Sequence, residues 1–189
     1  MTDSEHIYGH LPVIETGRLL LRKLTLADAG DMFEYGSDPM VSRFMPWEVH
    51  QTTADTEEYL RFILNGYEQK NKLTWAIELK SEGKMIGTID YVKWLSKHGR
   101  AEIGYALSRN YWGNGLTQEA AKALIAFGFE KMGLNKVEAP IIPDNFQSQR
   151  VLEKVGMVKE GVARQHFLMK GRFVDLAMYA VLKADFIAE

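Results

Sequence analysis

The chain has 189 residues, of which 46% are hydrophobic and 25% charged, and this size and composition predict one soluble domain spanning residues 1–189. Its 23 basic and 25 acidic side chains give a formal net charge of −2, which argues against a broad nucleic-acid-binding surface. It contains no cysteine, no apolar run long enough for a membrane span and a polar N-terminal extension over about residues 1–15, so we expect a cytoplasmic protein without disulfides, thiolate metal sites or cysteine nucleophiles.

Alternating and helical spacings of apolar residues predict the order of elements along the chain. They are a strand over 18–23, a helix over 25–37, a loop over 38–51, a helix over 53–69, a hairpin of strands 74–79 and 85–91, a strand over 102–108, a helix over 116–132, a strand over 136–142, a helix over 145–155, and strands over about 158–167 and 173–182. This order predicts an α+β domain in which helices pack on a mixed sheet.

Local signals mark several of these boundaries. Thr25 with Asp28 forms a capping-box start for the first helix, and Gly156 ends the third long one. On the helix over 53–69, we expect the buried face to carry Tyr59, Phe62, Ile63 and Tyr67.

The turn Gly113-Asn114-Gly115 lies between a strand and a long helix, directly after Trp112. Such a turn leaves several backbone N–H groups unpaired at the positive end of a helix dipole, which suits a phosphate or pyrophosphate. A tight turn without a ligand is the alternative, but the strand and helix around it favour binding. Thr117 is either a further hydroxyl donor or a helix-start residue.

A second feature opens the helix over 145–155. Asn145 follows a strand directly, and its simplest role is to cap this helix. Ser148 lies one turn later on the same face, so both side chains can reach one groove. The five histidines, His6, His10, His50, His98 and His166, show no metal-ligand spacing and are expected at the surface.

Together these motifs resemble the GNAT superfamily of acyl-CoA-dependent N-acetyltransferases. The resemblance covers residues 18–182 and rests on strand–Trp112-Gly113-Asn114-Gly115–helix followed by strand–Asn145-x-x-Ser148–helix–Gly156-Met157. The segments 101–105 (Ala-Glu-Ile-Gly-Tyr) and 171–175 (Gly-Arg-Phe-Val-Asp) are similar to the subgroup that acetylates the N-terminal alanine or serine of ribosomal proteins. The implied fold is a mostly antiparallel sheet of six to seven strands with helices on both faces and a splayed central strand pair.

The resemblance implies acetyl-CoA as co-substrate and no metal. The pantetheine arm would pair with Leu107 and Ser108, and Asn145 would bind it from the other side of the splayed strands. Ser148 would lie near the thioester sulfur. The pyrophosphate would bind the N–H groups of the loop residues, which are Trp112, Gly113, Asn114, Gly115, Leu116 and Thr117.

Two positions depart from the family. The phosphate loop of relatives often begins with Gln or Arg where this chain has Asn110, although main-chain donors can still bind the phosphate. Many relatives have a tyrosine acid where this chain has Leu152, so Ser148, water or no group at all protonates the leaving thiolate. Direct attack by the amine is expected because no cysteine can carry the acyl group. A backbone N–H near Leu107 would stabilise the developing oxyanion.

Glu102 is the first candidate for the base because it lies on the cofactor-binding strand. A surface role or a salt bridge to a neighbour such as Arg100 is about equally plausible, and Glu138 is a weaker candidate. For the amine acceptor, the apolar loop over 40–47, with Trp47, forms either one wall of the site or core packing. The turn over 165–173 would form the opposite wall, and Tyr105 is a further substrate-binding candidate.

Three functions remain open from the sequence. The first is acetylation of a protein N-terminal amine, and the second is acetylation of a small amine such as a polyamine, aminoglycoside or amino acid. A polyamine site would need an acidic cluster, for which Glu57 and Glu58 are the available pair, although a solvated helix face explains them equally well. The third is a non-catalytic acyl-CoA sensor. Neither nucleic acid nor a membrane is expected as partner, and the chain is expected to be a monomer or homodimer.

Overall fold

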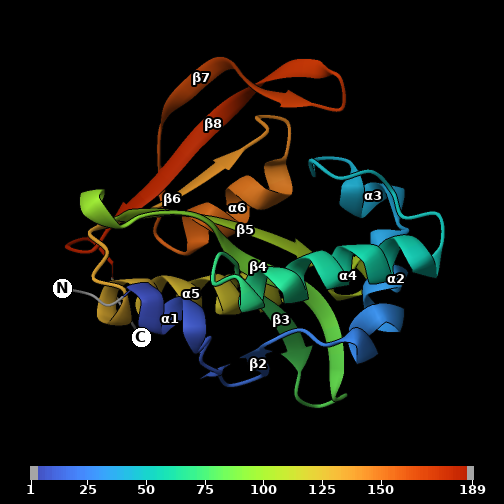
Figure 1. Ribbon diagram of the computed structural model, residues 1–189. Coiled ribbons are helices and arrows are strands. Elements are labelled where there is room, and N and C mark those ends of the chain that lie inside the picture. The colour runs from blue at the N-terminus through green and yellow to red at the C-terminus, as the bar shows by residue number, and fades with distance from the viewer. Residues whose placement is uncertain (1–3, 187–189) are drawn as a thin grey trace.

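A computed structural model describes residues 4–186 of the chain (Figure 1). Eight strands form one sheet in the order β1-β2-β3-β4-β5-β6-β8-β7. The strands are β1 Ile14–Glu15, β2 Leu19–Arg22, β3 Leu73–Leu79, β4 Lys84–Leu95, β5 Arg100–Leu107, β6 Lys136–Ile141, β7 Val158–Met169 and β8 Arg172–Leu182. The helices are α1 Ser4–Gly9, α2 Ala29–Gly36, α3 Pro39–Ser42, α4 Thr53–Glu68, α5 Leu116–Lys131 and α6 Phe146–Lys154. The predicted α+β class is confirmed, and the strand beyond the expected seven is the two-residue β1.

The centre of the sheet contains its one exception to antiparallel pairing within residues 4–186. Strands β5 and β6 run parallel, and their pairing covers only the positions from Arg100↔Lys136 to Glu102↔Glu138. Beyond Glu102, β5 pairs on with β4 as far as Leu107, while β6 pairs on with β8 as far as Ile141. The two strands therefore separate after a short shared stretch, which confirms the splayed central pair.

Helices cover both faces of the sheet. Side chains of successive strand residues point to opposite faces, so apolar residues on both faces need a layer that buries them. Ala101, Ile103 and Leu107 of β5 pack in one core with α5 and α6, and we call this side the α5 face. Ala106 of the same strand packs in a second core with Met32 of α2 and with α4, and this side is the α4 face. Figure 1 shows α4 crossing one side of the sheet while α5 runs along the other.

Trp75 of β3 anchors the larger core. It has no exposed surface and makes edge contacts with the rings of Tyr91 and Phe127. Its indole N–H donates to the Pro12 carbonyl at 2.8 Å, so its polar atom is satisfied despite burial. Tyr91 in turn donates to the Leu124 carbonyl of α5 at 2.6 Å, which joins the helix to the sheet.

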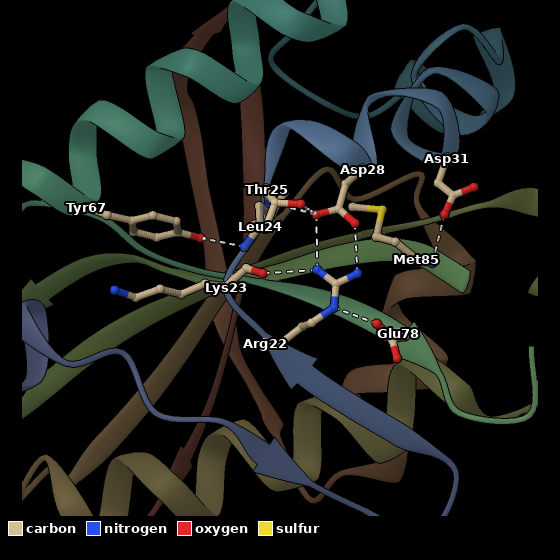
Figure 2. A network of polar contacts seen from close by, with 9 residues as sticks. All are labelled: Arg22, Lys23, Leu24, Thr25, Asp28, Asp31, Tyr67, Glu78 and Met85. Atoms are coloured by element: carbon tan, nitrogen blue, oxygen red, sulfur yellow. Dashed lines mark hydrogen bonds and ion pairs between the residues drawn. The ribbon is translucent and has the colours of Figure 1, made fainter. Parts of the chain in front are cut away.

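A network of polar contacts holds the entry into α2 against the sheet edge (Figure 2). The Arg22 guanidinium donates to both carboxylate oxygens of Asp28, at 2.8 and 3.0 Å, and also contacts Glu78 of β3. The same Asp28 carboxylate accepts from the N–H of Thr25, so the predicted capping box is present. Asp28 is buried; burial raises its pKa, but the hydrogen bonds from Arg22 and Thr25 prevail and the pKa lies below its usual value.

Two predictions about the first half of the chain need correction. Phe62 was expected on the buried face of α4, but it is 56% exposed and the buried positions are Thr56, Leu60, Ile63 and Gly66. The Lys72 ammonium lies 4.6 Å from the Phe62 ring centre, and this contact accounts for an aromatic residue outside the core. The expected loop over 38–51 contains the short helix α3, capped by Asp38. Among residues 4–186, no helix combines the length and apolar character that a membrane span requires.

Candidate active site

An open groove of about 540 Å³ lies where β5 and β6 separate. Its walls come from the end of β5, the loop before α5, the first turns of α5 and α6, and the α3 segment. Nine residues predicted for the site line it, namely Tyr105, Leu107, Trp112, Gly113, Gly115, Leu116, Thr117, Asn145 and Ser148. Segments that are far apart in the sequence therefore meet at the splay, as the fold required.

The backbone of β5 turns alternate amide groups into this groove. The Ser108 N–H donates to the Ile86 carbonyl of β4, so Ser108 faces β4 and is not among the groove-lining residues. Because alternate residues of a strand direct their amides to opposite sides, the amides of Leu107 and Tyr105 point away from β4. In agreement, the Leu107 carbonyl accepts from the Trp112 indole at 2.8 Å, which ties the loop to the strand end.

The glycine loop presents free donors at the start of α5. Gly113 and Gly115 have φ values of +80° and +72°, which glycine adopts without strain. Within the described part of the chain, none of the N–H groups of residues 113–117 donates a hydrogen bond. The Asn114 side chain contributes to the shape of the loop, because its amide donates to the carbonyls of Tyr111 and Trp112. Arg43, Arg150 and Lys154 bring positive charge to the groove wall, so the site suits a pyrophosphate.

Asn145 and Ser148 occupy the opposite wall. The Asn145 side-chain oxygen accepts from the Ser148 N–H at 3.2 Å, so the capping role is confirmed and the amide nitrogen remains available as a donor. The Ser148 hydroxyl lies 2.7 Å from the Tyr105 hydroxyl, which joins α6 to β5 across the groove. Burial raises the pKa of Tyr105 to about 12, against a smaller lowering by the Ser148 hydrogen bond, so the phenol stays protonated at neutral pH.

The Tyr105–Ser148 contact was missed from the sequence, where Tyr105 was expected only to bind substrate. Its side chain lies on the α5 face, beside the predicted cofactor residues. Strand alternation could have placed it there, since Ile103 and Leu107 share its face. Leu152, which replaces the family's tyrosine, is fully buried in the core.

The two candidate bases lie in different surroundings. Glu102 keeps 25% of its side chain exposed and lies 3.7 Å from Lys93, so its ion pair is with Lys93 rather than with Arg100. Glu138 is buried and contacts both Arg100 and Lys136 at 3.2 Å. Glu138 therefore has two cationic partners and Glu102 has one, and the choice of base between them stays a prediction.

Residues of the loop over 40–47 both line the groove and pack in the core. Met40, Phe44 and Met45 line the groove, while Met45 and Trp47 also pack against the core on the α4 face. The tip of the β7–β8 hairpin reaches this segment, where the Lys170 ammonium donates to the Ser42 carbonyl at 2.9 Å. The two segments that were expected to form opposite walls therefore contact each other at this point.

Trp47 also lines a small cavity on the α4 face, together with Tyr35, His50, Tyr59 and Thr88. His50 corrects the expectation of surface histidines: it is half-buried between Trp47 and Tyr59 and bonds the Thr56 hydroxyl at 2.8 Å. Burial lowers its pKa despite the nearby Asp55 carboxylate. His10, His98 and His166 are exposed, and the side chain of His6 lies outside the described residues.

Comparison with known proteins assigns the chain and its fold to a family. A family profile described as "Acetyltransferase (GNAT) domain" matches residues 18–158. The chain belongs to the GNAT acetyltransferase family. It is 34% identical over 172 residues to YoaA of Bacillus subtilis (strain 168), an uncharacterized N-acetyltransferase, and the match covers 91% of this chain and 97% of YoaA.

Solved structures agree with this GNAT assignment. A GNAT-family acetyltransferase from Bacillus anthracis has 30% identity and a TM-score of 0.81, covering 92% of this chain and 99% of that one. RimL, a ribosomal L7/L12 alpha-N-protein acetyltransferase in complex with coenzyme A, has a TM-score of 0.79 with coverages of 90% and 98%. At 18% identity, RimL shows the shared fold alone.

GNAT acetyltransferases use acetyl-CoA, and the residues of this acetyltransferase suit it. The free loop N–H groups match a pyrophosphate, the basic groove wall matches its charge, and the unpaired β5 amides match an extended arm. Among residues 4–186, no group of His, Asp and Glu side chains is placed to hold a metal ion.

Proposed function

We propose that this acetyltransferase moves the acetyl group of acetyl-CoA to the N-terminal amine of a protein or peptide by direct attack. The observation that carries this choice is a pair of exposed apolar side chains on the β7–β8 hairpin, whose tip contacts the α3 segment of the groove wall. Leu168 and Phe173 are Cα partners there, and they are 59% and 66% exposed. Such a surface suits a polypeptide better than a bare polyamine. The named activity of RimL, a structural neighbour, supports the same choice.

Two acidic residues that could have favoured a polyamine do not face the groove. Glu57 and Glu58 are exposed on α4, and Glu57 contacts Arg61 one turn along the same helix. Neither belongs to the groove wall or to the small cavity beside Trp47. A solvated helix face therefore accounts for the pair, which weakens the small-polyamine alternative.

For acetyl-CoA, the proposed contacts follow the groove from its mouth to the splay. The N–H groups of residues 113–117 bind the pyrophosphate, and Arg150 with Lys154 adds charge. The Trp112 N–H was predicted for the same role, but it donates to the Arg109 carbonyl at 3.1 Å. The Leu107 backbone and the Asn145 side-chain amide bind the pantetheine arm from its two sides. Ser108 was predicted beside Leu107, but its N–H and carbonyl are bonded to Ile86 and Tyr111. Acetyl-CoA supplies a thioester whose carbonyl accepts the amine.

For the transfer itself, three groups take proposed roles. A β5 amide at Leu107 or Tyr105 donates to the carbonyl oxygen as negative charge develops there. Glu102, through water, carries away the proton that the amine releases. The Ser148 hydroxyl protonates the leaving sulfur, and the protonated Tyr105 phenol at 2.7 Å replenishes or orients that proton.

A thiol-release assay tests the proposal. Acetyl-CoA would be offered with peptides starting in Ala, Ser or Met, their N-blocked forms, spermidine, an aminoglycoside and free amino acids. We expect turnover of at least one peptide, lost when its terminal amine is blocked. Turnover of small amines alone would mean that the acceptor is a small amine and not a peptide N-terminus. Acetyl-CoA binding by calorimetry with no turnover across the panel would favour the sensor instead.

A further inference from the structure

Asp90 of β4 is a carboxyl group that the proposed chemistry leaves unused. Its Cα partners are Thr74 on β3 and Gly104 on β5, and its side chain lies on the α4 face. The Thr74 hydroxyl is its hydrogen-bond partner. Among residues 4–186, no basic side chain comes within ion-pair distance of it, unlike the pairs made by Glu102 and Glu138. The Lys72 ammonium is near enough to lower the pKa of this carboxyl but forms no ion pair with it, so the carboxyl can contact a further cation.

Gly104 keeps one side of this carboxyl uncovered. A Cβ atom at Gly104 would lie 3.1 Å from Asp90 Oδ1 and 2.9 Å from the Val92 side chain, closer than ordinary contacts. Gly104 also lies two residues past Glu102, the last β5 residue that pairs with β6. Neighbouring strands are about 4.8 Å apart, and β5 is the strand that borders the splay. The Asp90 carboxyl on β4 is therefore one strand away from it.

The next residue pair on the α4 face lines the small cavity beside Trp47. Thr88 and Ala106 are Cα partners and form its floor, directly beside the Asp90–Gly104 pair. Tyr59 lines the cavity and lies close enough to Asp90 for the carboxylate charge to raise the pKa of its phenol. Aromatic rings and a carboxylate around a small-residue floor are the surroundings that bind an ammonium group.

Burial raises the pKa of Asp90 to about 7, against smaller opposing effects of Lys72 and Thr74. His50 lines the neighbouring cavity, and burial lowers its pKa. The other titratable groups that face Asp90 are Tyr35 from α2, Tyr59 and Tyr67 from α4, and Lys72 before β3. Burial raises the pKa of all three tyrosines, so they stay neutral at physiological pH.

We propose that Asp90 binds the ammonium group of the acceptor and takes the proton that must leave before the amine can attack. This inference rests on the proposed acetyl transfer and names the residue that prepares its nucleophile. The proton moves from nitrogen to a carboxylate oxygen, and the freed lone pair forms the N–C bond. The C–S bond then breaks with its electron pair on sulfur. The ammonium loses two protons in all. The one that Asp90 takes is released to solvent past Glu102, and the one that nitrogen loses after the attack reaches the sulfur through Ser148.

Asp90→Asn removes the charge at nearly constant shape and is the test variant. Asp31→Asn is the matched control, because Asp31 is also a partly buried aspartate that accepts a backbone N–H, from Met85, at 3.1 Å. For the amine that the wild type acetylates, we expect Asp90→Asn to lower kcat/KM about 100-fold at pH 7. The acetyl-CoA Kd should stay within about twofold in both variants, because neither residue lines the groove.

The pH profile separates a chemical role from a structural one. An N-terminal amine has a pKa near ~8, so at pH 9 it is mostly neutral without help and the Asp90→Asn defect should shrink to about tenfold or less. A defect of equal size at pH 7 and pH 9, or kcat/KM within about threefold of Asp31→Asn, would overturn the role of Asp90 and leave the acetyltransferase function standing. A wild type that binds acetyl-CoA but acetylates no amine would overturn both.

Discussion

The two sides of the groove are built in different ways. The proposed coenzyme side consists of two contiguous segments, 113–117 and 145–148, whose backbone N–H groups and one cap carry the proposed contacts. The proposed acceptor side collects side chains from α2, α4, β4 and the segment around Trp47, which line a separate small cavity, and the hairpin tip at Lys170. Backbone sites tolerate changes of side chain, whereas a site made of distant side chains depends on each identity. The difference explains why one fold can keep its coenzyme and change its acceptor.

The largest expected effect is a loss of stability at Arg22, which lies below the proposed acceptor side. This loss should leave acetyl-CoA binding unchanged. Arg22→Met leaves the buried Asp28 carboxylate without its cation, and we expect a loss of about 3 kcal/mol in the free energy of unfolding. The acetyl-CoA Kd of the folded variant should not change, because Arg22 does not touch the groove. Urea unfolding and calorimetry measure the two quantities. Arg61→Met, at an exposed i,i+4 pair, is the control and should cost under about 0.5 kcal/mol.

The same pair gives a pH dependence with a defined sign. The folded-state pKa of Asp28 is lowered, so its contribution is complete above its unfolded pKa of about 3.9 and is lost as pH falls through the folded value. The stability gap between wild type and Arg22→Met should therefore be constant from pH 7 to about 5 and narrow below about 4. A gap that widens on acidification would contradict this assignment.

Gly128 tests the core beneath the coenzyme side. Alanine usually stabilises a helix interior, but a Cβ here would lie 2.2 Å from the Tyr91 hydroxyl. We expect Gly128→Ala to cost about 2 kcal/mol in thermal or urea unfolding. Gly30→Ala in α2, where a Cβ would meet no atom within 4 Å, should be neutral or stabilise by up to about 1 kcal/mol. Equal behaviour of the two variants would argue against the close helix-to-sheet contact.

Gly115 tests whether the loop backbone binds the coenzyme. Gly115→Ala places a side chain at a φ of +72°, and relief of a strain of about 1–2 kcal/mol should shift the loop N–H groups and weaken acetyl-CoA binding about tenfold. Gly156→Ala meets the same strain at a φ of +86° outside the groove. It should lose similar stability but keep its Kd in calorimetry. A similar loss of acetyl-CoA affinity in both variants would mean that backbone strain lowers affinity wherever it occurs. The loop at Gly115 would then have no special role in binding.

Substitution of Asn145 should have the smallest effect on acetyl-CoA affinity. It separates the role of this side chain in coenzyme binding from its role as a helix cap. Serine also caps helices well, so Asn145→Ser should keep stability within about 0.5 kcal/mol while removing the amide donor. We expect acetyl-CoA to bind about fivefold more weakly, in line with the loss of one hydrogen bond of about 1 kcal/mol. Unchanged affinity would leave Asn145 with its capping role alone.

The sequence predicted the parts of the molecule that depend on neighbours in the chain. The glycine loop, the Asn145 cap and the order of elements were found because each has a local pattern at fixed spacing. The Tyr105–Ser148 contact and the setting of Asp90 were not, because each depends on strand register between distant segments. Phe62 was misplaced for a related reason: helical spacing defines a face, but only the packed sheet decides how wide that face is.

The short parallel pairing of β5 and β6 has a thermodynamic consequence. Two antiparallel halves of the sheet, β1 to β5 and β6 to β8, meet over only three residue pairs, and the groove exists only when both are in place. A molecule bound there should stabilise the joined state, and at 100 times its Kd this linkage is worth about 2.7 kcal/mol. Bound acetyl-CoA would then stabilise the contact between the two halves of the sheet. The cellular concentration of the coenzyme would therefore set how long this protein survives proteolysis.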